Sequence, residues 1–277
     1  MSSKLHALIP LDGSDLAEAV FPAVSELGVA EVTLLSVPGP ASGAEAECYL
    51  NNAAERAHAA GLTKVKKWVR EGKPPEVIVE SATRLGASLI ALTTHGRSGF
   101  DRFVLGSVAE KVIRTAAHPV LVVRSNAPVR PLLERILVPL DGSEKSWRSV
   151  EVLKSLVDPE KVRLTLIEVA ETLGDSPRIE AIRTGDDLAS RFLSLQLDGV
   201  EQRLLNAAAR ARTLGFEALT ETAAGRPASQ IMDAADRMGA TLIALATSGR
   251  SGPSRWVLGS VTELVLRASN VPLLICR

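Results

Sequence analysis

The sequence predicts an α/β protein with two repeated, doubly wound domains, each a five-stranded parallel sheet flanked by helices. Apolar runs of strand length alternate with segments of helical spacing through most of the 277 residues. Aromatic residues make up only 3% of the chain, so its core must be formed by the aliphatic residues typical of buried parallel strands. Residues 72–124 recur at 225–277 with 28 identities in 53 aligned positions. We therefore expect two copies of one fold.

The beginnings of the two copies also match, but at a different offset. Residues 9–14 (IPLDGS) correspond to 138–143 (VPLDGS) with a shift of 129, whereas the later segments are shifted by 153. The second copy therefore carries 24 extra residues, which we expect at about 171–203 because Gly, Asp, Ser and Pro interrupt the pattern there. The predicted units are a first domain at 1–126, a linker at 127–134 and a second domain at 135–277.

Within the first copy, five strands and four helices follow in strict alternation. The strands are short apolar runs, except that the third alternates polar and apolar residues and is expected at a sheet edge. The first helix is indicated by apolar residues at three- and four-residue intervals, the second by its alanines and a closing glycine, and the last two by apolar periodicity. The predicted strands are 5–11, 32–37, 65–69, 87–93 and 120–123. The predicted helices are 16–27, 44–60, 75–85 and 107–117.

The last strand of each copy is uncharged and strongly β-forming. Val120–Val123 and Leu273–Cys276 would promote aggregation if either lay at an open sheet edge. The simplest prediction is that the two strands pair with each other across a pseudo-twofold axis, which makes the chain an intrachain pseudo-dimer. The extra residues of the second copy have the spacing of an amphipathic helix, for which core packing, a lid over the second site and a dimer surface all remain open.

We expect the candidate site of each copy where its first and fourth strands end, because parallel sheets bind ligands at the carboxyl ends of their strands. Asp12 and Asp141 follow the first strands, and glycine-rich stretches follow the fourth. Glycines permit positive φ and let backbone N–H groups approach a ligand, and a helix N-terminus attracts phosphate. Four structural alternatives stay open. The aspartates can form Asx turns, and Ser107 and Ser260 can cap helices in capping boxes with glutamates three residues later. The arginines of the loops can be solvated, and Val37 and Val169 can be plain strand ends.

With these residues the chain resembles a tandem universal stress protein. The nucleotide-binding members of that family carry an Asp after the first strand, a Val at the end of the second and Gly-x2-Gly-x9-Gly-Ser/Thr after the fourth. The first glycine of that motif is replaced here by Thr93 and Ala246. The matching residues are Asp12, Val37, Gly96, Gly106 and Ser107 in the first copy, and Asp141, Val169, Gly249, Gly259 and Ser260 in the second.

The resemblance implies an adenine nucleotide as ligand: ATP, or AMP or ADP, with or without Mg²⁺. It places the aspartates near the adenosine, the valine backbone at the adenine and the Gly-Ser turns at the phosphates. The nucleotide-binding residues expected are Pro10, Asp12, Val37, Thr93, Gly96, Arg97, Gly99, Gly106, Ser107 and Val108 in the first copy, with Pro139, Asp141, Val169, Ala246, Gly249, Arg250, Gly252, Gly259, Ser260 and Val261 in the second.

Several other classes of function are disfavoured. A formal net charge of zero argues against a binder of nucleic acid or of a membrane surface. No P-loop motif, metal-ligand spacing or catalytic nucleophile is found, so no catalytic residue is predicted. Two distant cysteines and the absence of a signal-peptide pattern favour a cytoplasmic protein. Three hypotheses remain: a nucleotide-dependent regulator in stress response, a partner-binding scaffold without nucleotide, and a slow ATPase. A homodimer is a further open expectation.

Overall fold

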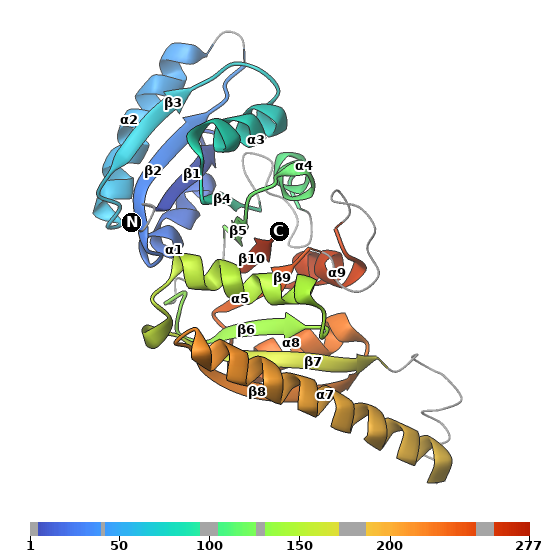
Figure 1. Cartoon of the computed structure of the whole chain (residues 1–277). Helices are drawn as coiled ribbons and strands as arrows, with labels where there is room; N and C mark the ends of the chain where they lie inside the picture. Colours follow the sequence, from blue (N-terminus) through green and yellow to red (C-terminus); the bar gives the residue numbers. More distant parts are fainter. Residues whose placement is uncertain (1–4, 40–41, 95–104, 126–130, 172–186, 248–257) are drawn as a thin grey trace.

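The ten strands found among the described residues form one sheet. A computed structural model describes residues 5–39, 42–94, 105–125, 131–171, 187–247 and 258–277. The strand order is β3-β2-β1-β4-β5-β10-β9-β6-β7-β8, so each copy supplies one half of the sheet (Figure 1). The strands are β1 (Leu5–Leu11), β2 (Val29–Ser36), β3 (Val65–Val69), β4 (Leu89–Thr93), β5 (Val120–Val123), β6 (Ile136–Leu140), β7 (Arg163–Glu171), β8 (Glu217–Gly225), β9 (Leu242–Ala246) and β10 (Leu273–Cys276).

Helices cover both faces of this sheet. Alternate residues of a strand point to opposite faces, and Ile9 accordingly joins one buried cluster while Leu8 joins the other. Helices α1, α2, α5 and α7 contribute to the first cluster, and α3, α4, α8 and α9 to the second. The α-helices are α1 (Phe21–Ser25), α2 (Gly43–Ala59), α3 (Pro74–Leu85), α4 (Ser107–Thr115), α5 (Glu144–Leu156), α7 (Asp187–Thr213), α8 (Pro227–Met238) and α9 (Ser260–Ala268). The prediction of two doubly wound α/β domains is confirmed.

The seam between the copies is the pairing predicted from the last strands. β5 and β10 are antiparallel, with Leu274 opposite Leu121, whereas the other strand pairs are parallel. The arginine that follows each of these strands crosses the seam. Arg124 donates through Nη2 to the carbonyl oxygen of Arg267 (2.8 Å) and through Nε to that of Ser269, at the end of α9. Arg277 donates to a carbonyl of α4. The two halves therefore share one continuous sheet and cap each other's helices.

The first predicted helix is the element that differs most from the structure. Instead of one helix over 16–27, a 3₁₀ helix, η1 (Asp15–Val20), is followed by α1, which has Pro22 at its start. Proline has no N–H to donate and its ring clashes with the preceding turn, so a continuous α-helix through this position is disfavoured. A second 3₁₀ segment, η2 (Pro159–Lys161), precedes β7 in the other copy.

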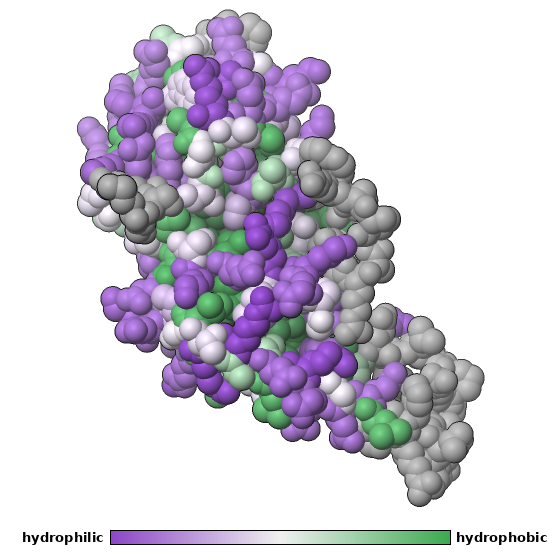
Figure 2. Space-filling view, viewed as in Figure 1, coloured by the Kyte–Doolittle hydropathy of each residue, from purple (hydrophilic) through white to green (hydrophobic). Residues whose placement is uncertain are grey.

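The surface is mixed in character. Figure 2 shows hydrophilic residues spread over both halves of one face, with hydrophobic residues in small groups between them. The edge strand β3 exposes Lys66 and Lys67, as the sequence predicts for a sheet edge. Among the residues described, no helix is both long enough and apolar enough to cross a bilayer.

Candidate functional site

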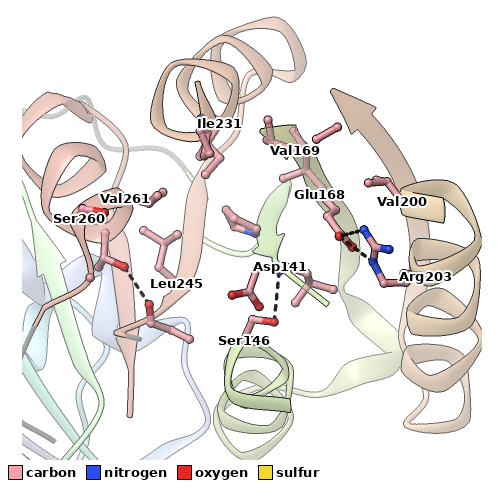
Figure 3. Close-up of a pocket in the computed structure, with 18 of the residues that line it drawn as sticks. Asp141, Ser146, Glu168, Val169, Val200, Arg203, Ile231, Leu245, Ser260 and Val261 are labelled. Carbon is pink, nitrogen blue, oxygen red and sulfur yellow. Dashed lines mark hydrogen bonds and ion pairs between the residues drawn. The ribbon is translucent and has the colours of Figure 1, made fainter. Parts of the chain in front are cut away.

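The second copy contains a cleft of about 670 Å³ at the carboxyl end of its strands. It lies between β6 and β9, where the order of the strands reverses, which is the usual ligand position in open α/β sheets. The volume is within the range of about 300–1,000 Å³ typical of small-molecule sites. All the described residues predicted for the second copy line this cleft (Figure 3). They are Pro139, Asp141, Val169, Ala246, Gly259, Ser260 and Val261.

Asp141 and Asp12 each close a tight turn at the end of the first strand of their copy. Oδ1 of Asp141 accepts hydrogen bonds from the backbone N–H (3.0 Å) and the hydroxyl (2.6 Å) of Ser143. Asp12 makes the same two bonds with Ser14, at 3.0 and 2.6 Å. Ser143 and Ser14 then cap the following helices. The Asx-turn alternative is therefore confirmed for both aspartates, and in the second copy the same side chain also borders the cleft.

Gly259 and Gly106 let the backbone lie close to a neighbouring carbonyl group, and neither has a positive φ. Their φ values are −60° and −58°, which any residue can adopt. A Cβ atom at Gly259 would, however, lie 3.0 Å from the carbonyl oxygen of Thr247, and one at Gly106 would lie 3.0 Å from that of Thr94. The same carbonyls accept the glycine N–H groups at 2.7 and 2.8 Å. The turn into each helix is therefore drawn tightly against the end of the fourth strand.

The capping boxes predicted for Ser107 and Ser260 are not formed. Gly106 and Gly259 occupy the N-cap positions, and no side-chain cap bond is present at either helix. The serines are exposed first residues of α4 and α9. The two glutamates, at the fourth residue of each helix, instead form ion pairs. Glu263 pairs with Arg114 across the seam and with Arg267, both at 3.1 Å. These arginines balance carboxylates that would otherwise repel an anion at the helix start.

Val169 marks the other end of the second cleft. The pairing of β7 with β6 ends at Glu168, whereas its pairing with β8 continues to Glu171. The edge of β7 that faces β6 is therefore no longer covered by a strand from Val169 onward, and Val169 lines the cleft. In the first copy, β2 ends at Ser36, and Val37 lies one residue beyond it. The two copies thus differ at this position in spite of their shared sequence pattern.

The first copy places its predicted residues at equivalent points of the sheet. Pro10 and Asp12 lie at the end of β1, Thr93 at the end of the adjacent β4, and Gly106, Ser107 and Val108 at the start of α4. Close to Asp12, the Tyr49 hydroxyl donates to the Ser14 carbonyl (3.3 Å). Burial, followed by a hydrogen bond to Glu18, raises the pKa of Tyr49, so its phenol stays protonated.

Six of the predicted residues lie outside the described part of the chain. They are the glycines and arginines of the two loops that follow the fourth strands. The structure therefore leaves their predicted role untested. They are Gly96, Arg97, Gly99, Gly249, Arg250 and Gly252.

Two charged residues of the second cleft were missed by the sequence reasoning. Glu168 is only 4% exposed, and its Oε1 accepts from Arg203 Nε at 2.8 Å and Nη2 at 2.5 Å. The signal that could have identified Glu168 is a charged residue flanked on both sides by apolar residues of the strand, Ile167 and Val169. Arg203 comes from α7, and nothing in its local sequence indicates a place beside β7. The helix runs from within the expected insertion to Thr213; it packs Leu204 into the core and also lines the cleft.

The fold and the cleft together define a class: a tandem, doubly wound α/β protein with a ligand-sized cleft at a topological switch point. Comparison with known proteins gives the family. The model of the universal stress protein family matches residues 23–124 and 133–277, which is most of the chain. The chain therefore belongs to the universal stress protein family.

Individual relatives and structures agree with this assignment. A universal stress protein of Mycobacterium tuberculosis is 27% identical over 199 residues, covering 69% of this chain and 62% of that protein. YxiE of Bacillus subtilis is 28% identical over 156 residues, covering 53% of this chain and all of YxiE. A Methanocaldococcus jannaschii relative is 48% identical over 61 residues, 22% of this chain and only 36% of that protein's length. The crystal structure of an Archaeoglobus fulgidus universal stress protein shares the fold over 98% of both chains, with a TM-score of 0.67 at 24% identity.

Proposed function

We propose that the chain binds an adenine nucleotide, ATP, ADP or AMP, and acts in stress response as a nucleotide-dependent regulator. The observation that carries this proposal is the geometry of the second cleft. The first turn of α9 and the end of β7 lie on opposite sides of it, with Asp141 between them (Figure 3). A helix N-terminus suits a phosphate group, and an uncovered strand edge suits the hydrogen-bonding edge of a base. A nucleotide would span these two features.

The residues present fit such a ligand. Gly259 allows the start of α9 to lie tightly against the end of β9 at the border of the cleft, because a Cβ there would crowd the Thr247 carbonyl. Ile167, Val169, Ile231 and Leu245 give the cleft an apolar surface against which a base can pack. No group of three or more His, Cys, Asp or Glu residues able to hold a metal occurs in the described parts of the chain. Any Mg²⁺ would therefore depend on phosphate oxygens for much of its coordination, as is usual for this ion.

The direct test is the content of the purified protein. The full chain is denatured, and the released small molecules are separated by ion exchange and identified by mass. An adenine nucleotide at one or two equivalents per chain is expected. Protein isolated empty should show a higher melting temperature with millimolar ATP or AMP, with or without Mg²⁺. An empty protein that also shows no thermal shift would overturn the proposal.

A pair of matched variants locates the binding. Ser260→Glu adds a carboxylate to the first turn of α9, where it interacts favourably with the helix dipole but repels phosphate. Ser107→Glu makes the same change in α4. Ser260→Glu should keep the fold and lose the nucleotide of the second cleft, whereas Ser107→Glu should affect only the first copy. If nucleotide binding survives unchanged in the double variant, the helix starts are not the phosphate sites.

A further inference from the structure

Four charged side chains join the two copies at the seam. Helices α4 and α9 lie on the same face of the sheet, on either side of the pairing of β5 with β10 (Figure 1). Nη2 of Arg114 in α4 lies 3.1 Å from Oε1 of Glu263 in α9 and 3.1 Å from Oε1 of Glu110 in its own helix. Nη2 of Arg267 in α9 lies 3.1 Å from Glu263 and 3.8 Å from Glu110. We call these four residues the seam quartet.

The seam quartet has more influence on the local charge than on the stability of the fold. Its side chains are 33–48% exposed, and ion pairs as exposed as these contribute little to stability, because water solvates the separated charges nearly as well. Two arginines and two glutamates sum to zero. The quartet therefore presents no net negative charge to the starts of α4 and α9, although a glutamate lies in the fourth position of each helix.

The second cleft meets the seam quartet at the start of α9. Ser260, Val261 and Thr262 form the first turn of this helix and line the cleft, and Glu263 is the next residue. The backbone N–H groups of a first turn have no partner within their helix. Gly259 occupies the N-cap, and no side chain among the described residues forms a cap bond there. Donors of this kind, together with the helix dipole, favour an anion.

The other charges of the cleft disfavour an anion away from α9. Among the described residues that line it, only Asp141, Glu168 and Arg203 are charged. The positive charge of Arg203 is balanced by its ion pair with Glu168, and Asp141 adds a carboxylate. Ser260 and Val261 lie on the side of the cleft opposite Arg203 (Figure 3). An anionic group of a ligand is therefore best accommodated at the start of α9.

Glu263 would oppose that anion if its charge were not balanced. The rise of a helix places it about 4.5 Å along the axis from Ser260, well within the distance of about 8–10 Å over which charges interact in physiological salt. Arg114 and Arg267 each approach Oε1 of Glu263 to 3.1 Å. One of these two arginines comes from the first copy. The charge balance at the start of α9 therefore includes a side chain that the second copy does not supply.

We propose that Arg114 of the first copy is an electrostatic determinant of ligand affinity in the second cleft. It balances Glu263 and thereby keeps the start of α9 attractive to the phosphate group of a nucleotide. It acts through Glu263, not through contact with the ligand. This inference rests on the proposed nucleotide function, and it makes the second cleft complete only when both copies are present.

The experiment measures the binding of AMP and ATP to the full chain by titration calorimetry. Hydrogen exchange of the peptide that contains the start of α9, followed over the same nucleotide concentrations, reports on the second cleft alone. Arg114→Gln leaves the quartet with one net negative charge and should weaken binding there by roughly two- to tenfold at low salt, the effect of one charge at about 10 Å. The loss should shrink between about 0.05 M and 0.5 M salt, because salt screens the charge. Arg114→Lys keeps the charge and should stay within about twofold of wild type.

A charge-balanced double variant and a matched control separate charge from structure. Arg114→Gln combined with Glu263→Gln removes one charge of each sign, so it should return the affinity to within about twofold of wild type. Arg163→Gln also removes one arginine from an exposed ion pair, with Glu217 at 2.8 Å. Arg163 begins β7, at the end of the strand opposite the cleft, so this variant should bind nucleotide as the wild type does.

The outcomes distinguish this inference from the proposed function. If wild type and Arg114→Gln bind nucleotide equally at low salt, or if the loss persists in the double variant and at high salt, the inference is wrong while nucleotide binding stands. The same conclusion follows if a nucleotide binds but leaves hydrogen exchange at the start of α9 unchanged. If neither AMP nor ATP binds the wild-type chain, the proposed function fails first, and this inference fails with it.

Discussion

Gly259 offers a sharp test of how tightly the start of α9 is built. In Gly259→Ala, the new Cβ would lie 3.0 Å from the Thr247 carbonyl oxygen, which already accepts the Gly259 N–H at 2.7 Å. Relief of this contact requires that the helix start move by a few tenths of an ångström, and such overpacking typically costs about 1–3 kcal/mol. The backbone itself is not strained by alanine, because φ is −60° and ψ is 146°.

The matched control is Gly43→Ala in the first turn of α2. No atom lies within 4 Å of a Cβ at that position. Both substitutions reduce the freedom of the unfolded chain, which stabilises by about 0.4–1 kcal/mol. We therefore expect Gly43→Ala to raise the free energy of unfolding slightly and Gly259→Ala to lower it, so that the two variants differ by about 1–3 kcal/mol in urea denaturation.

If the start of α9 binds phosphate as proposed, Gly259→Ala should displace that site. A displacement that costs about 1.4 kcal/mol of binding free energy weakens affinity about tenfold, so we expect nucleotide affinity to fall by about this factor. If Gly259→Ala and Gly43→Ala have equal stability and equal affinity, the close approach of the turn to β9 has no energetic role. The physical reasoning about this glycine would then be refuted.

Three further predictions concern the seam, the pH dependence and the thiols. Leu274 is 1% exposed and pairs with Leu121 across the seam, so Leu274→Ala should lower the free energy of unfolding by about 2–5 kcal/mol. Leu264 is 57% exposed, and Leu264→Ala should lower it by less than about 0.5 kcal/mol. Similar losses in the two variants would argue against a tightly packed seam. Burial lowers the pKa of His6, so the unfolded chain binds a proton at higher pH than the folded chain, and stability should fall as the pH drops below about 6.5. His6→Asn should therefore lose less unfolding free energy than the wild type between pH 7.5 and pH 5.5 in denaturant titrations. Equal losses in the two proteins would contradict this prediction. Burial raises the pKa of the Cys276 thiol, whereas Cys48 is exposed. A disulfide reagent should therefore react with one thiol in the native protein and with two in urea. Rapid reaction of both thiols in the native protein would show that the last strand opens readily.

Much of the site was predictable because the chain repeats itself. A strand end, a glycine and a serine at fixed spacing recur in both copies, and parallel strands bring their carboxyl ends to one edge of a sheet. Pro139, Asp141 and Ala246 therefore meet at one cleft although they are far apart in sequence. The predicted approach of the Gly259 backbone to a ligand stays a prediction. The structure shows a close approach of Gly259 to the Thr247 carbonyl instead, and its φ is not positive; a distance to another element cannot be read from a single residue type.

The sequence by itself determined the α/β class from the alternation of its apolar runs, and the duplication from the identity of its two halves. It also determined the pairing of β5 with β10, because a β-forming edge must be covered. Only the tertiary structure decided that Arg203 lies beside Glu168. The two residues are 35 positions apart, on a helix and a strand whose rotation and register depend on packing across the whole half-sheet. A long-range ion pair of this kind leaves no periodic trace in the sequence. The partner of Glu168 therefore emerged only from the folded chain.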